Sequence, residues 1–184
     1  MTIYSIQKPE TEIKVTIMHE KLTKKDIEMM EAELEDRRMN IRPKIMEEVK
    51  RCREYGDLSE NYEYKAAKQA QRQNDSRMRY LQNMIKTAQI IDEDAQKGGV
   101  QLFDRVTLWL PEDEEEMTVQ VVSTVRTDPS QGRVSLESPL GKALLGAMLG
   151  DIINVHVSES YSYDAEIRAV EPAEDDGSAP LLPY

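Results

Sequence analysis

Two acidic residues lie close together in the short segment GDLSEN. Asp57 and Glu60 are three positions apart, between two long segments with helical periodicity. Two carboxylates at this spacing can bind a cation, but Mg²⁺ requires about six oxygen ligands in near-octahedral geometry. The pair could therefore form only half of a magnesium site, completed by a partner. The same pattern also suits a helix N-terminus, with Ser59 as another N-cap candidate, and on pattern alone we favour that structural interpretation.

A one-sided row of basic residues follows the acidic pair. On a helical wheel its members fall within about 65° of one another; they are Lys65, Lys68, Arg72, Arg79 and Lys86. Faces that only stabilise a helix usually mix charges of both signs, and the alternative here is such a solvated face. A stripe of one sign instead predicts a surface that guides a polyanion, such as an RNA end, towards the carboxylates. Arg53, in the preceding segment, can extend this surface.

Two long helices are expected to position these groups. Thr23 and Asp26 form a capping pattern at the start of the first helix, and Gly56 is a suitable end. Apolar residues then recur at spacings of three and four, at Ile27, Met30, Leu34, Ile41, Ile45, Val49 and Cys52. Pro43 should kink or split this helix near Arg42.

The second helix is expected from about residue 60 to residue 91. Its apolar or small stripe comprises Ala67, Ala70, Asn74, Met78, Leu81, Ile85 and Ala88. Two antiparallel helices of about 30 residues make a hairpin roughly 45 Å long. Tyr64 should pack across its narrow end, whereas Tyr62 could either pack there or stack on a base.

The pattern changes after the second helix. Residues 97–99 (KGG) are expected to be a linker, and residues 100–170 show the alternation of strands. The expected strands are 104–110, 117–125, 133–137, 151–157 and 163–170, with a short helix after Ser138. The fold class is therefore α+β: a coiled-coil hairpin over 22–96, with its tip at 56–61, and a small antiparallel sheet domain with one helix. Residues 1–21 are expected to be an N-terminal extension, and 171–184 a disordered acidic tail.

Composition narrows the possible functions. The chain has 184 residues and a net charge of −11, all of which is accounted for by residues 100–184, with 5 Lys/Arg against 16 Asp/Glu. This acidity argues against free DNA as a partner. No apolar run approaches membrane-spanning length, so no membrane partner is expected. The single cysteine, Cys52, suits a reducing cytoplasm, and one cysteine with two histidines does not make a zinc site.

These residues resemble a known family. GDLSENYEYKAAK is similar to the signature of the Gre transcript cleavage factors, GreA and GreB, and three further segments match in the same order. They are IRPKI at 41–45, QIIDED at 89–94, as the end of the second helix, and SPLGKALLGAMLGDIINV at 138–155. The resemblance covers about residues 22–170. It implies an FKBP-like C-terminal domain, while Tyr62 replaces a residue that is often small in the family.

The resemblance also implies a function. Gre factors insert the hairpin through the secondary channel of bacterial RNA polymerase and stimulate endonucleolytic cleavage of nascent RNA near its 3′ end in backtracked complexes. By resemblance, Asp57 and Glu60 are the acidic pair that shares Mg²⁺ with the polymerase. Arg53, Lys68 and Arg72, with Lys65 beside them, would contact the RNA, and the docking contact on the polymerase would involve Ser138, Pro139 and Leu140. The protein is then not an enzyme alone and needs no small-molecule substrate.

Three other functions fit parts of the sequence. A non-catalytic channel regulator would share the hairpin, but the intact GDLSEN argues against it. A prolyl isomerase is suggested by an FKBP-like domain, yet Phe103 and Trp109 are the only aromatic residues beyond the tyrosines. A coiled-coil adaptor would leave the acidic tip and the basic stripe unexplained.

Overall fold

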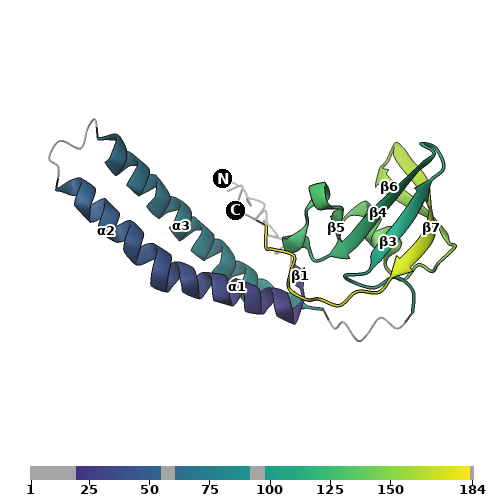
Figure 1. The fold of residues 1–184 in the computed structure, drawn as a ribbon, viewed down its shortest axis with the longest axis horizontal. Coiled ribbons are helices and arrows are strands. Elements are labelled where there is room, and N and C mark those ends of the chain that lie inside the picture. Colours follow the sequence, from purple (N-terminus) through teal and green to yellow (C-terminus); the bar gives the residue numbers. More distant parts are fainter. Residues whose placement is uncertain (1–19, 55–60, 92–97, 183–184) are drawn as a thin grey trace, which may run out of the picture.

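A computed structural model describes residues 20–54, 61–91 and 98–182 of the chain. It has a helical hairpin and a sheet domain at the base of that hairpin (Figure 1). Among the described residues, no helix is long and apolar enough to cross a membrane. Residues 1–19 of the expected N-terminal extension and the acidic residues Asp57 and Glu60 lie outside the described residues.

The first arm of the hairpin starts as predicted and is interrupted before Pro43. Thr23 caps α1 (Lys24–Asp36), accepting a bond from the Asp26 N–H while the Asp26 carboxylate accepts one from the Thr23 N–H. A π-helical turn, η1 (Arg37–Ile41), then leads into α2 (Arg42–Arg53). Proline cannot donate a backbone bond and its ring crowds the carbonyl four residues earlier, so the wider π turn accommodates it without breaking the arm.

The second arm is shorter than predicted. It is α3 (Tyr62–Thr87), and Ala88 after it is extended. The expectation that helix continues to residue 91 is wrong, because β2 (Gln89–Ile90) pairs in parallel with β1 (Lys21–Leu22). The Gln89 and Ile91 N–H groups donate to the Glu20 and Leu22 carbonyls, both at 2.9 Å. This pairing closes the base of the hairpin.

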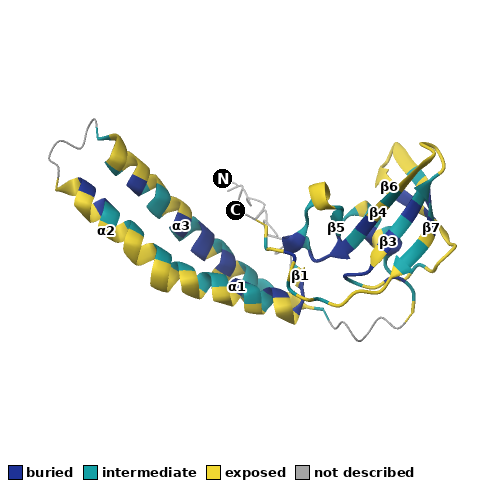
Figure 2. Cartoon of the chain, in the orientation of Figure 1, coloured by how far each residue is buried: buried dark blue, intermediate teal, exposed yellow. Residues whose placement is uncertain are grey.

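Two apolar clusters hold the arms together. The base cluster comprises Leu22, Met30, Leu81 and Val125, and the last of these comes from the sheet domain. The distal cluster comprises Val49, Cys52 and Ala67, with Tyr64 packed against it as expected. Figure 2 shows buried residues along the facing sides of the helices and exposed residues on the outer sides. The predicted seam is therefore confirmed on both arms.

The sheet domain contains one five-stranded sheet, in the order β5-β4-β3-β7-β6. The strands are β3 (Arg105–Leu110), β4 (Glu115–Val122), β5 (Arg133–Ser135), β6 (Ile152–Ser158) and β7 (Tyr161–Glu171). The expectation of a wholly antiparallel sheet is wrong, since β5 runs parallel to β4. The chain reverses through two 3₁₀ turns, η3 (Thr124–Arg126) and η4 (Pro129–Gln131), and so re-enters the sheet in the same direction as β4.

One short helix packs beside β6 and β5. It is α4 (Pro139–Leu144), capped by Ser138 as predicted. Gly141 lies where a Cβ would be 2.0 Å from the Ser135 carbonyl oxygen, so no other residue allows this close approach. The core of the domain is formed mainly by buried Val, Leu and Ile residues of the strands, with Leu144 from α4.

The segments expected to be a linker and a disordered tail both make defined contacts. A Cβ at Gly99 would lie 2.3 Å from the Gly146 oxygen, and the neighbouring Val100 N–H donates to the Ala147 carbonyl at 2.8 Å. Residues 172–182 return from β7 to the base of the hairpin, which differs from the expected disorder (Figure 1). Burial of Ala179 and pairing of Asp175 fix this segment despite its polar composition.

Candidate functional site

The candidate site lies at the end of the hairpin farthest from the sheet domain. The two arms end there, α2 at Arg53 and α3 at Tyr62 (Figure 1). In the sequence, Asp57 and Glu60 lie between these two helix ends. Those two residues fall within 55–60, so their geometry is outside the described residues. The described residues include the two helix ends that flank this segment in the sequence.

Asn61 caps the second arm. Its side-chain oxygen accepts a hydrogen bond from the Tyr64 N–H at 3.0 Å, and its backbone is extended as an N-cap requires. The capping role considered for Ser59 or Asp57 is therefore filled by Asn61. Capping of this helix therefore does not require Ser59 or Asp57, and the role of the acidic pair stays a prediction.

Tyr62 projects into solvent immediately after the cap. Its side chain is 81% exposed, and the Lys65 ammonium lies 5.5 Å from the centre of its ring. The alternative that Tyr62 packs across the seam is therefore excluded, whereas Tyr64 does pack there. An exposed aromatic ring with an adjacent cation is suited to stacking on a base.

Arg53 and Lys68, from opposite arms, line one shallow hollow of about 480 Å³. Lys50 lines it too, and sequence reasoning missed this residue although it lies one helical turn before Arg53. Gln71 forms another part of the wall and accepts a hydrogen bond from the Lys68 ammonium at 2.7 Å. The hollow thus gathers three cations close to the tip.

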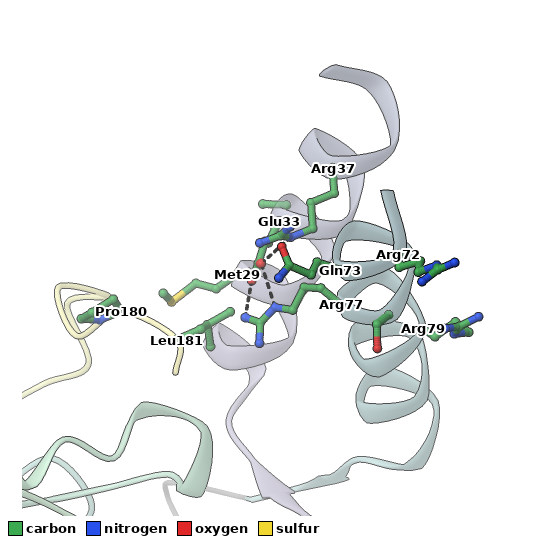
Figure 3. A pocket seen from close by; sticks show the side chains of 11 residues that line it. Met29, Glu33, Arg37, Arg72, Gln73, Arg77, Arg79, Pro180 and Leu181 are labelled. Carbon is green, nitrogen blue, oxygen red and sulfur yellow. Dashed lines mark hydrogen bonds and ion pairs between the residues drawn. The ribbon is translucent and has the colours of Figure 1, made fainter. Parts of the chain in front are cut away.

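Arg72 lies further along the stripe, near a larger open hollow that also involves the tail. Figure 3 shows Arg72 and Arg79 on the outer side of α3, pointing away from Glu33. The stripe is thus split: Lys68 faces the hollow with Arg53, Lys65 faces Tyr62, and Arg72 lies with Arg79. Both Arg72 and Arg79 are exposed, as a polyanion surface requires.

A polar cluster crosses the seam beneath this larger hollow. Glu33 accepts bonds from Arg77 at 2.9 and 2.7 Å and from Arg37 at 2.7 Å (Figure 3). Arg37 also donates to Asn74 at 3.2 Å. Burial by itself raises the pKa of Glu33, but the two guanidinium groups outweigh it and lower the pKa below its usual value. Arg77 is therefore part of the seam and not of the basic stripe.

Ser138, Pro139 and Leu140 line a separate hollow of about 280 Å³ on the sheet domain. The Ser138 hydroxyl accepts from the Gly141 N–H at 3.0 Å and donates to the Ser135 carbonyl at 2.6 Å, so this residue is primarily a helix cap. Val155, Val157 and Tyr163 are among the other residues that line it, and they add apolar surface. Burial, with Tyr161 nearby, raises the pKa of Tyr163, which therefore stays neutral.

The described part of the chain contains no candidate metal centre. Across residues 20–54, 61–91 and 98–182, no group of three or more His, Cys, Asp or Glu side chains could hold one. Asp57 and Glu60 would supply carboxylate oxygens, the donors that Mg²⁺ prefers, but too few for a complete set. The donor chemistry therefore fits a shared site, with the remaining ligands from a partner.

Comparison with known proteins finds matches to both halves of the chain. Residues 20–90 match the family model "Transcription elongation factor, N-terminal", and residues 95–172 match "Transcription elongation factor, GreA/GreB, C-term". The chain is 37% identical to the transcription elongation factor GreA of Oenococcus oeni over 153 residues, covering 83% of this chain and 94% of that protein. It is 40% identical to GreA of Leuconostoc mesenteroides over 147 residues, covering 79% and 92%.

A solved structure also matches much of the chain. The GreA factor homolog 1 (Gfh1) protein of Thermus thermophilus is 26% identical, with 84% of this chain and 99% of that chain covered and a TM-score of 0.40.

Proposed function

The chain belongs to the GreA/GreB family of transcription elongation factors, and from this we propose that it binds bacterial RNA polymerase and stimulates cleavage of nascent RNA. Under this proposal the hairpin enters the secondary channel of a backtracked or arrested complex, and the cut is endonucleolytic, near the RNA 3′ end. The observation that carries the proposal is the free end of the hairpin. Its second helix is capped by Asn61, so this cap does not require the carboxylates of Asp57 and Glu60 that precede it in the sequence.

Asp57 and Glu60 are the proposed catalytic pair. Together with carboxylates of the polymerase they would hold Mg²⁺, which when bound activates water and stabilises a leaving oxygen in phosphodiester hydrolysis. The contribution of this chain is to bring two negative charges to the end of a narrow arm. Alone it has an incomplete ligand set, which is consistent with a protein that is not an enzyme without its partner.

The basic residues near the tip are proposed to hold the extruded RNA. Arg53 and Lys68 share one hollow, and Lys65 and the Tyr62 ring lie together just beyond the helix cap. Cations on a groove attract the phosphate backbone, and an exposed ring stacks on a base without strong sequence preference. Arg72 extends the cationic surface away from the tip.

The sheet domain is proposed to dock on the rim of the channel through Ser138, Pro139 and Leu140. Their hollow is also lined by Val134, Val155 and Val157, with Arg133 beside them, and such a hollow suits an apolar side chain of a partner. We also propose that the domain is FKBP-like. The five-stranded sheet with a short helix beside it supports this finer description.

The test is cleavage of RNA in backtracked complexes by wild type and by the double variant Asp57→Ala, Glu60→Ala. Loss of groups that act directly in proton transfer or metal binding typically lowers a rate by about 100-fold or more. We expect that loss, with polymerase binding retained. The matched control is Glu54→Ala with Glu63→Ala, which removes the same charge from two exposed positions beside the tip.

Three outcomes distinguish the hypotheses. Full cleavage activity in the tip variant would contradict the proposal. Equal loss in the control variant would show that the charge of the tip, and not the pair, matters. Absence of stimulated cleavage by wild type, together with polymerase binding and slowed elongation, would establish the channel-regulator alternative.

A further inference from the structure

Residues 172–182 form a strap between the sheet domain and the hairpin. At one end the Ala173 N–H donates to Asp104 at 3.2 Å, and at the other the Leu182 N–H donates to the Val125 carbonyl at 2.7 Å. Between these bonds, Leu181 packs against the base cluster of the hairpin. The strap thus touches both parts of the molecule over its length.

A buried ion cluster lies under the strap. The Arg126 side chain is 0% exposed, and its Nε donates to Asp26 of α1. Its two terminal nitrogens donate to the two carboxylate oxygens of Asp175, at 2.5 and 2.9 Å. The guanidinium also lies 5.4 Å from the centre of the Phe103 ring. Hairpin, sheet domain and strap therefore meet at one side chain.

The carboxylates of Asp26 and Asp175 have different roles in this cluster. Asp26 already accepts the Thr23 N–H as part of the helix cap, so it stays with the hairpin whatever the sheet domain does. Without Asp175, both terminal nitrogens of Arg126 would lose these hydrogen-bond partners in a buried position. A buried guanidinium must pair its donors or reach water, so loss of Asp175 favours movement that opens the joint between hairpin and sheet domain.

Small rotations at this joint have large effects at the tip. α3 has 26 residues, which corresponds to about 39 Å at 1.5 Å per residue. A rotation of about 10° at the base would displace the far end by about 7 Å, by simple geometry from that length. Misplacement of reacting groups by even about 1 Å can cost about 100-fold in rate. The angle of the hairpin is therefore a quantity the protein must control.

We propose that Asp175 is a positioning residue, and that the strap holds the hairpin at the angle needed to enter its target. The expected effect on RNA cleavage rests on the proposed function. The role of Asp175 in fixing the angle between hairpin and sheet domain does not. A free factor with a loosened joint would spend only part of its time in the competent arrangement. Its apparent affinity for the polymerase would equal the intrinsic affinity multiplied by that fraction. Once the hairpin had entered, the channel would hold it in place.

The first experiment measures the joint in the free protein. Spin labels at Glu35→Cys on α1 and His156→Cys on β6 report the distance between hairpin and sheet domain by pulsed electron resonance, and both positions are exposed. Native Cys52 is buried and can stay. We expect one narrow distance distribution for the otherwise wild-type chain and for Glu174→Gln. Asp175→Asn, and removal of residues 173–184, should broaden it.

The second experiment measures cleavage against factor concentration. If the competent arrangement falls to about a third of the population, the half-saturating concentration rises about threefold. We expect at least this rise for Asp175→Asn, with an unchanged rate at saturation. Glu174→Gln, which loses the same charge one residue earlier at an exposed position, should match wild type. Circular dichroism of each variant identifies any that has simply unfolded.

The outcomes separate the two proposals. A narrow, unshifted distance distribution in both folded variants, Asp175→Asn and the truncation, would contradict the proposal that the strap fixes the hairpin angle. A broadened distribution with unchanged half-saturation would overturn the positioning role. If wild type fails to stimulate cleavage, the proposed function falls, while the distance measurement still decides whether Asp175 holds the joint.

Discussion

The two ends of the hairpin are built differently. At the base, Leu22 and Leu81 are 0% exposed and the sheet domain adds Val125 as a third wall. At the distal end the seam has only the two arms, and its cluster consists of small or medium side chains around Ala67. The large apolar side chain of Met46, on α2, is 43% exposed instead.

This difference shows where the molecule is rigid and where it is slender. Two helices alone cannot enclose a thick core, so small residues keep the distal arm narrow, and its stability depends on a thin seam. The base gains rigidity from a third element and from buried charges that span long sequence separations. An arm of this kind suits insertion into a confined space while its other end stays fixed.

The largest expected loss of stability follows from disrupting the ion cluster at the base of the hairpin. Arg126→Ala leaves Asp26 and Asp175 as buried carboxylates without their partner, so the free energy of unfolding should fall by about 3–5 kcal/mol. Urea denaturation followed by circular dichroism measures this. Lys142→Ala is the control, since it removes an exposed pair with Glu137 and should cost at most about 1 kcal/mol. Equal losses in the two variants would show that the base is not locked by its charges.

Apolar packing provides the next comparison between the two ends. Leu81→Ala at the base should lower the free energy of unfolding by about 2–5 kcal/mol, because the cavity is enclosed on three sides. Ala67→Gly in the distal seam should cost only about 1 kcal/mol, mainly through lost helix propensity. Hydrogen exchange should show the larger loss spreading into η3 for Leu81→Ala alone. A distal variant as costly as the base variant would contradict the thin-seam interpretation.

A smaller effect tests the cationic hollow near the tip. Arg53→Ala with Lys68→Ala should raise the half-saturating concentration in the cleavage assay several-fold. If both residues contact RNA phosphates, the plot of log affinity against log salt should become less steep by about 1.4. The control, Arg38→Ala with Lys44→Ala, removes equal charge from exposed positions outside that hollow. An unchanged salt slope in the hollow variant would argue that these cations do not touch RNA.

The smallest effect concerns pH and the polar cluster in the seam. The pKa of Glu33 is lowered in the folded protein, so its ionised form stabilises the fold. That contribution is present above the usual glutamate pKa of about 4.5 and disappears as pH falls through the lower folded value. Unfolding curves of wild type and Glu33→Gln should therefore converge as the pH drops from about 5 towards 3. Glu35→Gln, at an exposed position on the same helix, should give no such convergence.

Much of the hairpin was predictable from residue order because its determinants are local. Thr23 with Asp26, the apolar spacing from Ile27 to Cys52 and the proline at 43 act over one or a few helical turns. The tip was predictable as a location, but pattern alone favoured helix capping. The cap at Asn61 became visible only with the backbone in place.

The misjudged features depend on contacts between distant residues. The last turn predicted for the second helix is replaced by pairing between Gln89 and Glu20. The tail was expected to be disordered from its composition, but Asp175 finds Arg126, 49 residues away. No local sequence pattern predicts which residues pair over such long separations.

By itself, the sequence determined the two arms, the acidic pair Asp57 and Glu60 between them, the strands of the sheet domain and the family, because periodicity and motifs are properties of neighbouring residues. Only the tertiary structure decided which cations share a hollow, that β5 runs parallel to β4, and that Asp26, Arg126 and Asp175 meet at the base. Burial of charge is the physical reason. A carboxylate on a polar tail is unremarkable in solution, and it becomes a structural element only where folding removes water from its partner.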